Sequence, residues 1–288
     1  MSQSHLSINT LATGDGATTL NFGAGGSAGA GTSAVTNAGT FRTLSTAHVA
    51  SINGTGTTDV TAGTLYSSAA IRQNTLSIAN NSNAEIASNG GASSVSVVKT
   101  LNIGTTSSKL ELHNNDLVVD YGVNPSAYTS VVNKVKSGLV LLGGSGSGIA
   151  STDVDNQTVP GTMLAVVDDG DPNIAGAITS TSGYTIPSPT TSVIVKLPWF
   201  GDSDLSGTVD GSDYALIDTG FTSGGSLGGW VFGDYDYSGT VDSSDYALID
   251  TGFISQSGTL PNRQPWDYLA WVPSPCCEDE IESKRIGS

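Results

Sequence analysis

The chain has 288 residues, of which 37 are Gly and only 12% are charged. Charged residues and strong helix formers are too scarce for a coiled coil or a helical bundle, so the composition predicts a mainly β protein with many turns. Ten Lys and Arg against 26 Asp and Glu give a net charge of −16, which would repel phosphate groups and predicts no nucleic-acid partner.

Residues 1–122 are predicted to form a β-repeat region of short strands separated by turns rich in Gly, Asn, Ser and Thr. Apolar and polar residues alternate within the strands, as expected when one face is buried. Short stacked strands with one inward apolar row are typical of a β-solenoid, in which each coil is buried by its neighbours. The repeat length is irregular, so a sandwich of short strands is the alternative. The expected strands are 6–8, 19–22, 40–44, 64–66, 75–78, 84–86, 94–97, 101–103, 110–112 and 117–119.

Residues 123–200 are predicted to form a mixed β region with one helix. Four apolar residues follow helical spacing and predict that helix over 126–139. Apolar strands are expected at 163–167 and 192–197. The acidic group at 168–171 precedes a proline and is predicted to form a turn, with a third cation site as the alternative.

The region 202–250 contains ten Asp and no Glu, Lys or Arg, so its charge must be neutralised from outside the chain. It contains an internal duplication with an offset of 32, in which residues 201–221 match 233–253 at 18 of 21 positions. The three differences fall at the pairs 203/235, 205/237 and 211/243. So close a repeat indicates two copies of one functional unit rather than an acidic linker.

Each copy has the pattern of a 12-residue calcium loop that begins at its first Asp. Calcium takes six to eight oxygen ligands, and alternate positions of a tight loop can point successive oxygens inward. Gly207 and Gly239 stand at position 6, where the loop turns sharply. The pattern predicts two calcium ions, with oxygen ligands at positions 1, 3, 5, 7, 9 and 12. The predicted ligands are Asp202, Asp204, Ser206, Thr208, Asp210 and Asp213 in the first loop, and Asp234, Asp236, Ser238, Thr240, Asp242 and Asp245 in the second.

A helix is expected after each loop but not before it. The segments 213–219 and 245–251 have helical patterns, and Gly220 and Gly252 are expected to act as C-caps. Pro or paired Gly before the loops prevents an entering helix. The two loop–helix units are expected to pack with pseudo-twofold symmetry. The residues expected to be buried between them are Val209, Leu216, Ile217, Val241, Leu248 and Ile249.

These loop–helix repeats resemble the type I dockerin module, which binds calcium through two such repeats. They look most like the version at the C-terminal end of large secreted planctomycete-type proteins. A weaker similarity over 76–200, carried by 101–103, 110–121 and 148–151, links the preceding region to autotransporter-like β-strand-repeat surface proteins. The resemblance implies an extracellular or cell-surface location and a cohesin-like or other protein partner.

The ends of the two helices differ from those of cohesin-binding dockerins, in which a basic pair is common at the recognition surface. This chain has Asp218 and Asp250 there. A carboxylate near a helix C-terminus is mildly unfavourable, so these residues indicate a use in recognition, with a partner that presents a basic patch. Solvated residues copied by the duplication are the alternative.

Catalytic groups are scarce. The three histidines, His5, His48 and His113, are isolated from one another, and the first 200 residues hold only 11 acidic side chains. Acid–base catalysis needs convergent titratable groups, so we expect a protein that is not an enzyme. The C-terminal portion of a secreted carbohydrate-active, polysaccharide-degrading enzyme is one alternative, and a purely structural adhesin or stalk is the other.

The sequence therefore predicts four parts. They are a β-repeat region (1–122), a mixed β region (123–200), a dockerin-like calcium module (201–254) and a flexible tail (255–288) that holds both cysteines. No signal peptide is visible in 1–5, and no apolar run approaches the ~20 residues of a membrane span. The predicted function is a calcium-binding, non-catalytic extracellular or cell-surface protein whose dockerin-like module mediates calcium-dependent protein attachment.

Overall fold

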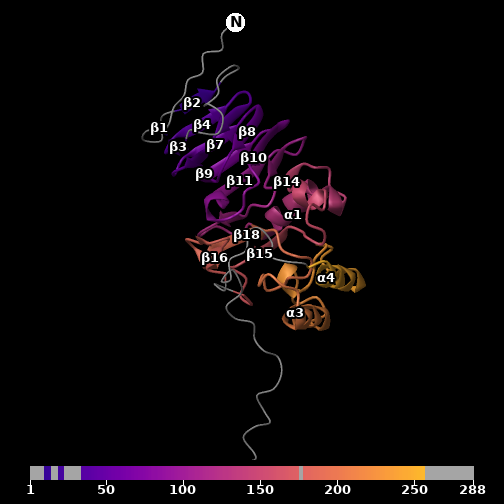
Figure 1. Ribbon diagram of the computed structural model, residues 1–288. Coiled ribbons are helices and arrows are strands. Elements are labelled where there is room, and N and C mark those ends of the chain that lie inside the picture. The colour runs from indigo at the N-terminus through magenta and orange to yellow at the C-terminus, as the bar shows by residue number, and fades with distance from the viewer. Residues whose placement is uncertain (1–9, 14–18, 23–33, 175–177, 257–288) are drawn as a thin grey trace, which may run out of the picture.

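The computed structural model describes residues 10–13, 19–22, 34–174 and 178–256, and over these residues the protein is mainly β (Figure 1). The expected strand at 6–8 and the expected tail from residue 257 onward lie outside them. The strands are β1 (Thr10–Thr13), β2 (Thr19–Phe22), β3 (Ala34–Asn37), β4 (Thr40–Thr43), β5 (Ala47–Val49), β6 (Ser51–Asn53), β7 (Thr57–Val60), β8 (Gly63–Ser67), β9 (Ile71–Ile78), β10 (Ser82–Ile86), β11 (Ser96–Ile103), β12 (Lys109–Glu111), β13 (Leu117–Asp120), β14 (Gly148–Ala150), β15 (Ala165–Asp168), β16 (Ser180–Thr181), β17 (Tyr184–Thr185) and β18 (Ser192–Lys196). The helices are α1 (Tyr128–Gly138), α2 (Thr152–Asp155), α3 (Gly211–Thr222) and α4 (Ser243–Ser255).

Parallel pairing stacks the strands of the first 150 residues into three ladders. The first joins β1, β3, β6, β9, β11 and β13, the second joins β2, β4, β7, β9 and β11, and the third joins β5, β8, β10, β12 and β14. Strands β9 and β11 have eight residues each and belong to both the first and the second ladder, so these two ladders form one sheet. Successive levels of the stack lie one above another in Figure 1, with the helices at one end.

A column of apolar side chains runs along the inside of the third ladder. The strand register aligns Ala47, Leu65, Ala84, Leu110 and Ile149, and all five are fully buried. Burying a Leu or Ile side chain contributes roughly 1.5–3 kcal/mol relative to leaving it exposed. Each of these residues is covered by its counterparts in the levels above and below, so the levels stabilise one another.

The parallel stack ends against antiparallel strands and helix α1. Strand β18 pairs antiparallel with both β13 and β15, which confirms the strands expected at 163–167 and 192–197. Helix α1 confirms the helix expected at 126–139, and it buries Val131 and Val135. Its last residue, Gly138, lies so close to β14 that an added Cβ would stand 2.0 Å from the backbone oxygen of Ile149.

Some elements differ from the sequence-based expectation. Strands β3, β5, β6 and β7 were not expected. They have only three or four residues each, and pairing with neighbouring levels defines them. The predicted strand at 94–97 begins as a 3-10 turn (Ala92–Ser94) before β11 starts. The short helix α2, which was not expected, starts at an N-cap where the Ser151 hydroxyl accepts a hydrogen bond from the Val154 N–H.

Helices α3 and α4 follow the two repeated loops as expected, but the prediction that Gly220 and Gly252 are their C-caps is wrong. Both glycines are buried inside helices that continue to Thr222 and Ser255. A Cβ at either position would lie 1.8 Å from a backbone oxygen, that of Phe232 for Gly220 and that of Phe200 for Gly252. Close approach of another segment explains these glycines.

Candidate metal centres

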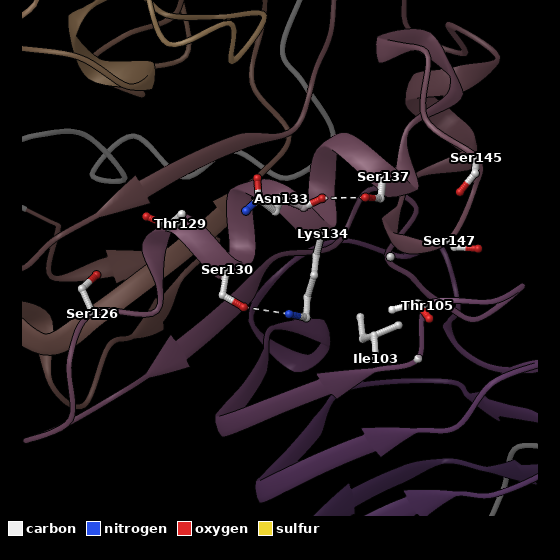
Figure 2. A pocket seen from close by; sticks show the side chains of 12 residues that line it. Ile103, Thr105, Ser126, Thr129, Ser130, Asn133, Lys134, Ser137, Ser145 and Ser147 are labelled. Carbon is white, nitrogen blue, oxygen red and sulfur yellow. Dashed lines mark hydrogen bonds between the residues drawn. The ribbon is translucent and has the colours of Figure 1, made fainter.

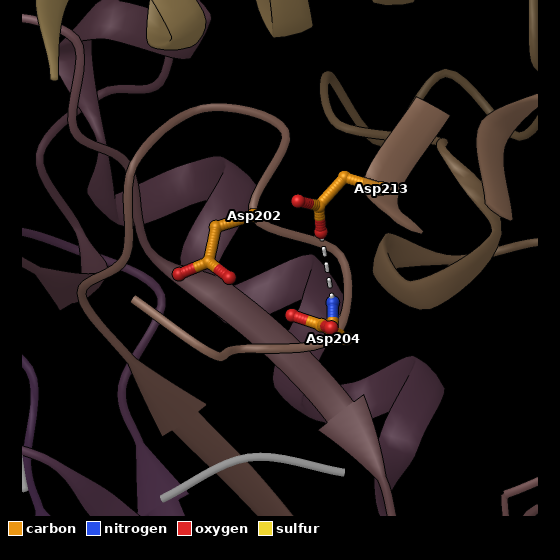
Figure 3. A group of neighbouring side chains, drawn as sticks. All are labelled: Asp202, Asp204 and Asp213. Carbon is orange, nitrogen blue, oxygen red and sulfur yellow. Dashed lines mark hydrogen bonds between the residues drawn. The ribbon is translucent and has the colours of Figure 1, made fainter. Parts of the chain in front are cut away.

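Two clusters of carboxylates lie in the loops that lead into α3 and α4. The first joins Asp202, Asp204 and Asp213, which Figure 3 shows around one point, and the second joins the equivalent residues Asp234, Asp236 and Asp245. Within each cluster, one oxygen from each residue lies within 4.8 Å of the others. The first and last Asp of each cluster are buried and the middle one is half-buried. These positions are 1, 3 and 12 of the predicted loops, and either group could hold a metal ion.

Backbone N–H groups fix the carboxylates of the first loop. Asp213 Oδ1 accepts hydrogen bonds from the N–H groups of Ser203 (2.7 Å) and Asp204 (3.3 Å), the latter drawn in Figure 3. The Gly207 N–H lies 3.2 Å from Asp202 Oδ2. Gly207 has a φ of 106°, in the region that favours glycine, so the sharp turn expected at loop position 6 is present.

The second loop repeats this arrangement. Asp245 Oδ1 accepts from the N–H of Tyr235 at 2.8 Å, and the Gly239 N–H lies 3.2 Å from Asp234 Oδ2. Gly239 has a φ of 92°. Two loops with the same hydrogen bonds therefore present the same three carboxylates, which is the structural counterpart of the sequence duplication.

Without a bound cation, burial and mutual repulsion disfavour the ionised form of the cluster carboxylates. Burial, together with the nearby charges of Asp204 and Asp202, raises the pKa of Asp213 to about 8. Burial also raises the pKa of Asp234 to about 6, with a contribution from Asp245, whose own pKa burial raises as well. A divalent cation in each cluster would remove this repulsion and allow all three groups to ionise.

The other predicted ligands lie in the same loops with different contacts. Asp210 and Asp242 form the N-caps of α3 and α4, where each accepts a hydrogen bond from the backbone N–H two residues further on, and both are exposed. Their own N–H groups donate to Asp213 and Asp245, which completes a capping box at each helix. The cluster carboxylate at position 12 therefore also fixes the start of the helix.

The remaining four predicted ligands stand on the exposed side of the loops. Ser206 Oγ donates to the backbone oxygen of Thr208 at 3.2 Å, and Ser238 Oγ donates to that of Thr240 at 3.0 Å. The structure thus brings together six of the twelve predicted residues in tight clusters. It places the other six beside them, with their oxygens engaged in capping or loop hydrogen bonds.

Reciprocal contacts hold the two loop–helix units together. The Tyr214 hydroxyl of α3 donates to Asp250 Oδ1 of α4 at 2.6 Å, and the Tyr246 hydroxyl of α4 donates to Asp218 of α3. Of the residues expected to be buried, Val209, Leu216, Ile217 and Ile249 are buried, and Val241 and Leu248 are partly buried against the core. Asp218 and Asp250 therefore have structural partners within the pair.

Tyr237, at position 4 of the second loop, fixes the paired units to the β region. Its fully buried hydroxyl donates to the backbone oxygen of Leu164 (2.7 Å) and accepts from the N–H of Val166 (2.8 Å). Lys136 of α1 donates to the backbone oxygen of Tyr237 at 2.6 Å. Tyr237 is a functional residue that was not expected. The other repeat has Leu205 at this position, and that difference is the signal that could have identified Tyr237.

Two further acidic groups, the segment 168–171 and Glu111, have structural partners. The acidic segment 168–171 forms the expected turn, closed by a hydrogen bond from the Asp171 N–H to the Asp168 oxygen. Glu111 is buried and accepts hydrogen bonds from the Thr152 N–H (2.7 Å) and Lys109 (3.1 Å). Burial alone would raise the pKa of Glu111, but these hydrogen bonds outweigh it, and the pKa is lowered. Glu111 thereby ties β12 to α2.

No protein-family model, curated protein or solved structure matches the chain. Among the described residues, every helix is too short or too polar to cross a membrane.

Proposed function

We propose that the chain is a calcium-binding, non-catalytic extracellular or cell-surface protein. The observation that carries this proposal is the pair of clusters Asp202/Asp204/Asp213 and Asp234/Asp236/Asp245, each formed by the same loop and helix start. All the available donors are oxygens, and hard oxygen ligands suit Ca²⁺ or Mg²⁺ rather than zinc or copper. The loop spacing and the additional oxygens at positions 5 and 7 favour the larger ion, calcium.

The test is calorimetric titration of the full chain with calcium chloride. We expect two bound ions, with magnesium as a weak competitor. Asp213→Asn and Asp245→Asn should each remove one site while keeping the size of the side chain, and the double variant should bind none. Asp171→Asn, which changes a carboxylate outside both clusters, is the matched control. Two sites of unchanged affinity in the double variant would contradict the proposal.

The attachment function rests on the resemblance to dockerin modules and on the arrangement of the chain. In this proposal the β region is a β-solenoid, supported by its three parallel ladders, and it presents the dockerin-like units at its end. Immobilised full chain should retain a cohesin-like or other protein from the extracellular fraction of its source only with calcium. The double variant Asp213→Asn, Asp245→Asn should lose this retention.

The second candidate function is a purely structural stalk, in which calcium only stiffens the end of the chain. The burial of Tyr237 against the β region favours the stalk, because this contact fixes the paired units to the end of the stack. A chain that binds two calcium ions but retains no protein, and that gains resistance to proteolysis with calcium, would support the stalk.

A further inference from the structure

A hollow of about 680 Å³ lies beside helix α1, between that helix, the residues after β11 and the loop before β14 (Figure 2). Its lining is rich in polar side chains, among them the hydroxyls of Thr105, Ser130, Ser137, Ser145 and Ser147 and the amide of Asn133. Figure 2 shows Lys134 extending from α1 toward Ile103, with its ammonium group beside Ser130. Lys134 Nζ donates to Ser130 Oγ at 2.7 Å.

A second hollow of about 340 Å³ also lies beside α1. It shares Ser130 and Lys134 with the first, and it adds Lys99 of β11 and Tyr121. The two hollows adjoin at Ser130 and Lys134, which line both, and Lys99 lines the second. We refer to the two hollows together as the groove. The joint volume is far larger than a single inorganic ion requires.

The groove has the opposite charge to the rest of the protein. Among the described residues that line the two hollows, the charged ones are Lys99 and Lys134, although the chain carries 26 acidic residues against ten basic ones. Asp168 is not a lining residue, but its carboxylate accepts hydrogen bonds from the hydroxyls of two that are, Tyr121 and Ser126. In the described part of the chain, the Lys and Arg residues that form ion pairs with carboxylates are Arg42, Lys109 and Lys196. Neither Lys99 nor Lys134 forms such a pair there. The burial of Lys134 lowers its pKa, as expected for a cation that is partly desolvated without an opposing charge.

We propose that this groove binds an acidic oligosaccharide, with its carboxylate or sulfate groups at Lys134 and Lys99 and its hydroxyls on the Ser, Thr and Asn side chains. Hydroxyl and amide groups can both donate and accept, which matches the hydroxyls of a sugar chain. Ile103 is the one large apolar side chain among the residues that line the first hollow, so this hollow suits a sugar chain better than the apolar side chains of a peptide. The second hollow adds Leu101, Val119 and Val131, and an acidic peptide is therefore one of the reference ligands in the test. This binding is independent of the two metal centres.

Calorimetry on the calcium-loaded full chain tests the proposal, with a short uronic-acid oligomer and a sulfated oligosaccharide as separate probes. A neutral oligosaccharide of equal length, inorganic sulfate and an acidic peptide are the reference ligands. We expect at least one acidic oligosaccharide to bind at least tenfold more tightly than each reference ligand. Comparison of the two acidic probes shows whether the groove prefers carboxylate or sulfate groups on the sugar chain.

Lys134→Gln and Lys99→Gln should each weaken that binding about tenfold. Arg42→Gln, which removes one positive charge from a surface ion pair on another level of the stack, is the control and should bind like the wild type. Ser137→Ala, which keeps the net charge, should weaken binding to a smaller extent. Equal binding of an acidic peptide or of inorganic sulfate, equal affinity in all three charge variants, or no binding of either acidic oligosaccharide would each overturn the proposal.

Discussion

Ser203 and Tyr235 stand at the same position of the two repeated loops, and their hydroxyl oxygens lie 2.6 Å apart in the folded protein. Both side chains are buried where the two loop–helix units meet. Two tyrosines would not fit in the space that one tyrosine and one serine fill, whereas two serines would leave a cavity. This difference between the repeats is therefore a requirement of their contact with each other. The difference between Leu205 and Tyr237 has another cause, since Tyr237 bonds the β region. Nothing in the structure explains the third difference, Gly211 against Ser243.

Ser203→Tyr, which makes the repeats identical at this position, should destabilise the protein by roughly 1–3 kcal/mol because it overpacks the contact. Chemical denaturation in saturating calcium measures the effect. Gly211→Ser makes the repeats identical at the unexplained position, where an added Cβ meets no neighbouring atom, and it should leave stability nearly unchanged. Equal stability of the two variants would show that the contact tolerates a second ring.

Gly220→Ala and Gly252→Ala should each destabilise the protein by roughly 1–3 kcal/mol, although alanine is the better helix former by about 1 kcal/mol. The reason is the backbone oxygen 1.8 Å from each added Cβ. Thermal unfolding of these variants is best compared with that of Gly211→Ala, at the first residue of α3, which should be neutral or stabilising. A rise in Tm for Gly220→Ala would refute the close approach.

Tyr237→Phe should lower the free energy of unfolding by about 1–3 kcal/mol, because it leaves the buried Val166 N–H and Leu164 oxygen without their partner. Urea unfolding measures the loss. Tyr66→Phe is a suitable control, since that ring stacks on His48 and is only half-buried. If the two substitutions have equal effects, Tyr237 is not the anchor described above.

Calcium affinity should rise between about pH 5 and pH 8 and then level off. Without a cation, the raised pKa values of Asp213 (about 8) and Asp234 (about 6) mean that the folded chain binds more protons than the unfolded chain above about pH 4. The stability of the calcium-free protein therefore falls as pH rises through this window. Calcium needs the ionised carboxylates, so the increase in Tm that it causes should grow over the same window. In Asp213→Asn this growth should be smaller, and an unchanged profile would contradict the assignment.

Glu111→Gln should destabilise the protein at neutral pH by roughly 1–3 kcal/mol. The folded pKa of Glu111 is below its ordinary value of 4.5, so its contribution is present above pH 4.5 and is lost as pH falls through the folded pKa. Unfolding of wild type and variant at a series of pH values should show the gap close in acid. Glu85→Gln is the control, and because the Glu85 side chain is 33% exposed, this variant should have a smaller effect at neutral pH.

The sequence indicated which carboxylates lie together better than it indicated their surroundings. Spacing within a tight loop is a local property, and Asp202, Asp204 and Asp213, at positions 1, 3 and 12 of one loop, lie together in the fold. The roles of Gly220 and Asp218 depend on the other repeat: a carbonyl from outside the helix packs on the glycine, and a tyrosine hydroxyl bonds the carboxylate. From the sequence alone, a glycine that caps a helix cannot be distinguished from one that allows another segment to pack closely against the helix.

The same limit applies to the β region. Strands of five or more residues, such as β9 and β11, were expected at least in part from their alternation. Strands of three residues contain too little sequence for a reliable period. Strand β12 was expected, whereas β5 was not, and pairing with a neighbouring level defines β5.

The crossed glycine contacts make the paired loop–helix units a closed assembly. Phe200, which leads into the first loop, packs on Gly252 of the second helix, and Phe232, which leads into the second loop, packs on Gly220 of the first. Each unit thus occupies the single site that the other offers, as in an isologous dimer, and a third tandem copy would find neither site open. The β ladders follow the opposite rule, because each level pairs with the next in the same way. Further duplication could lengthen the β region indefinitely, whereas the paired units are complete at two.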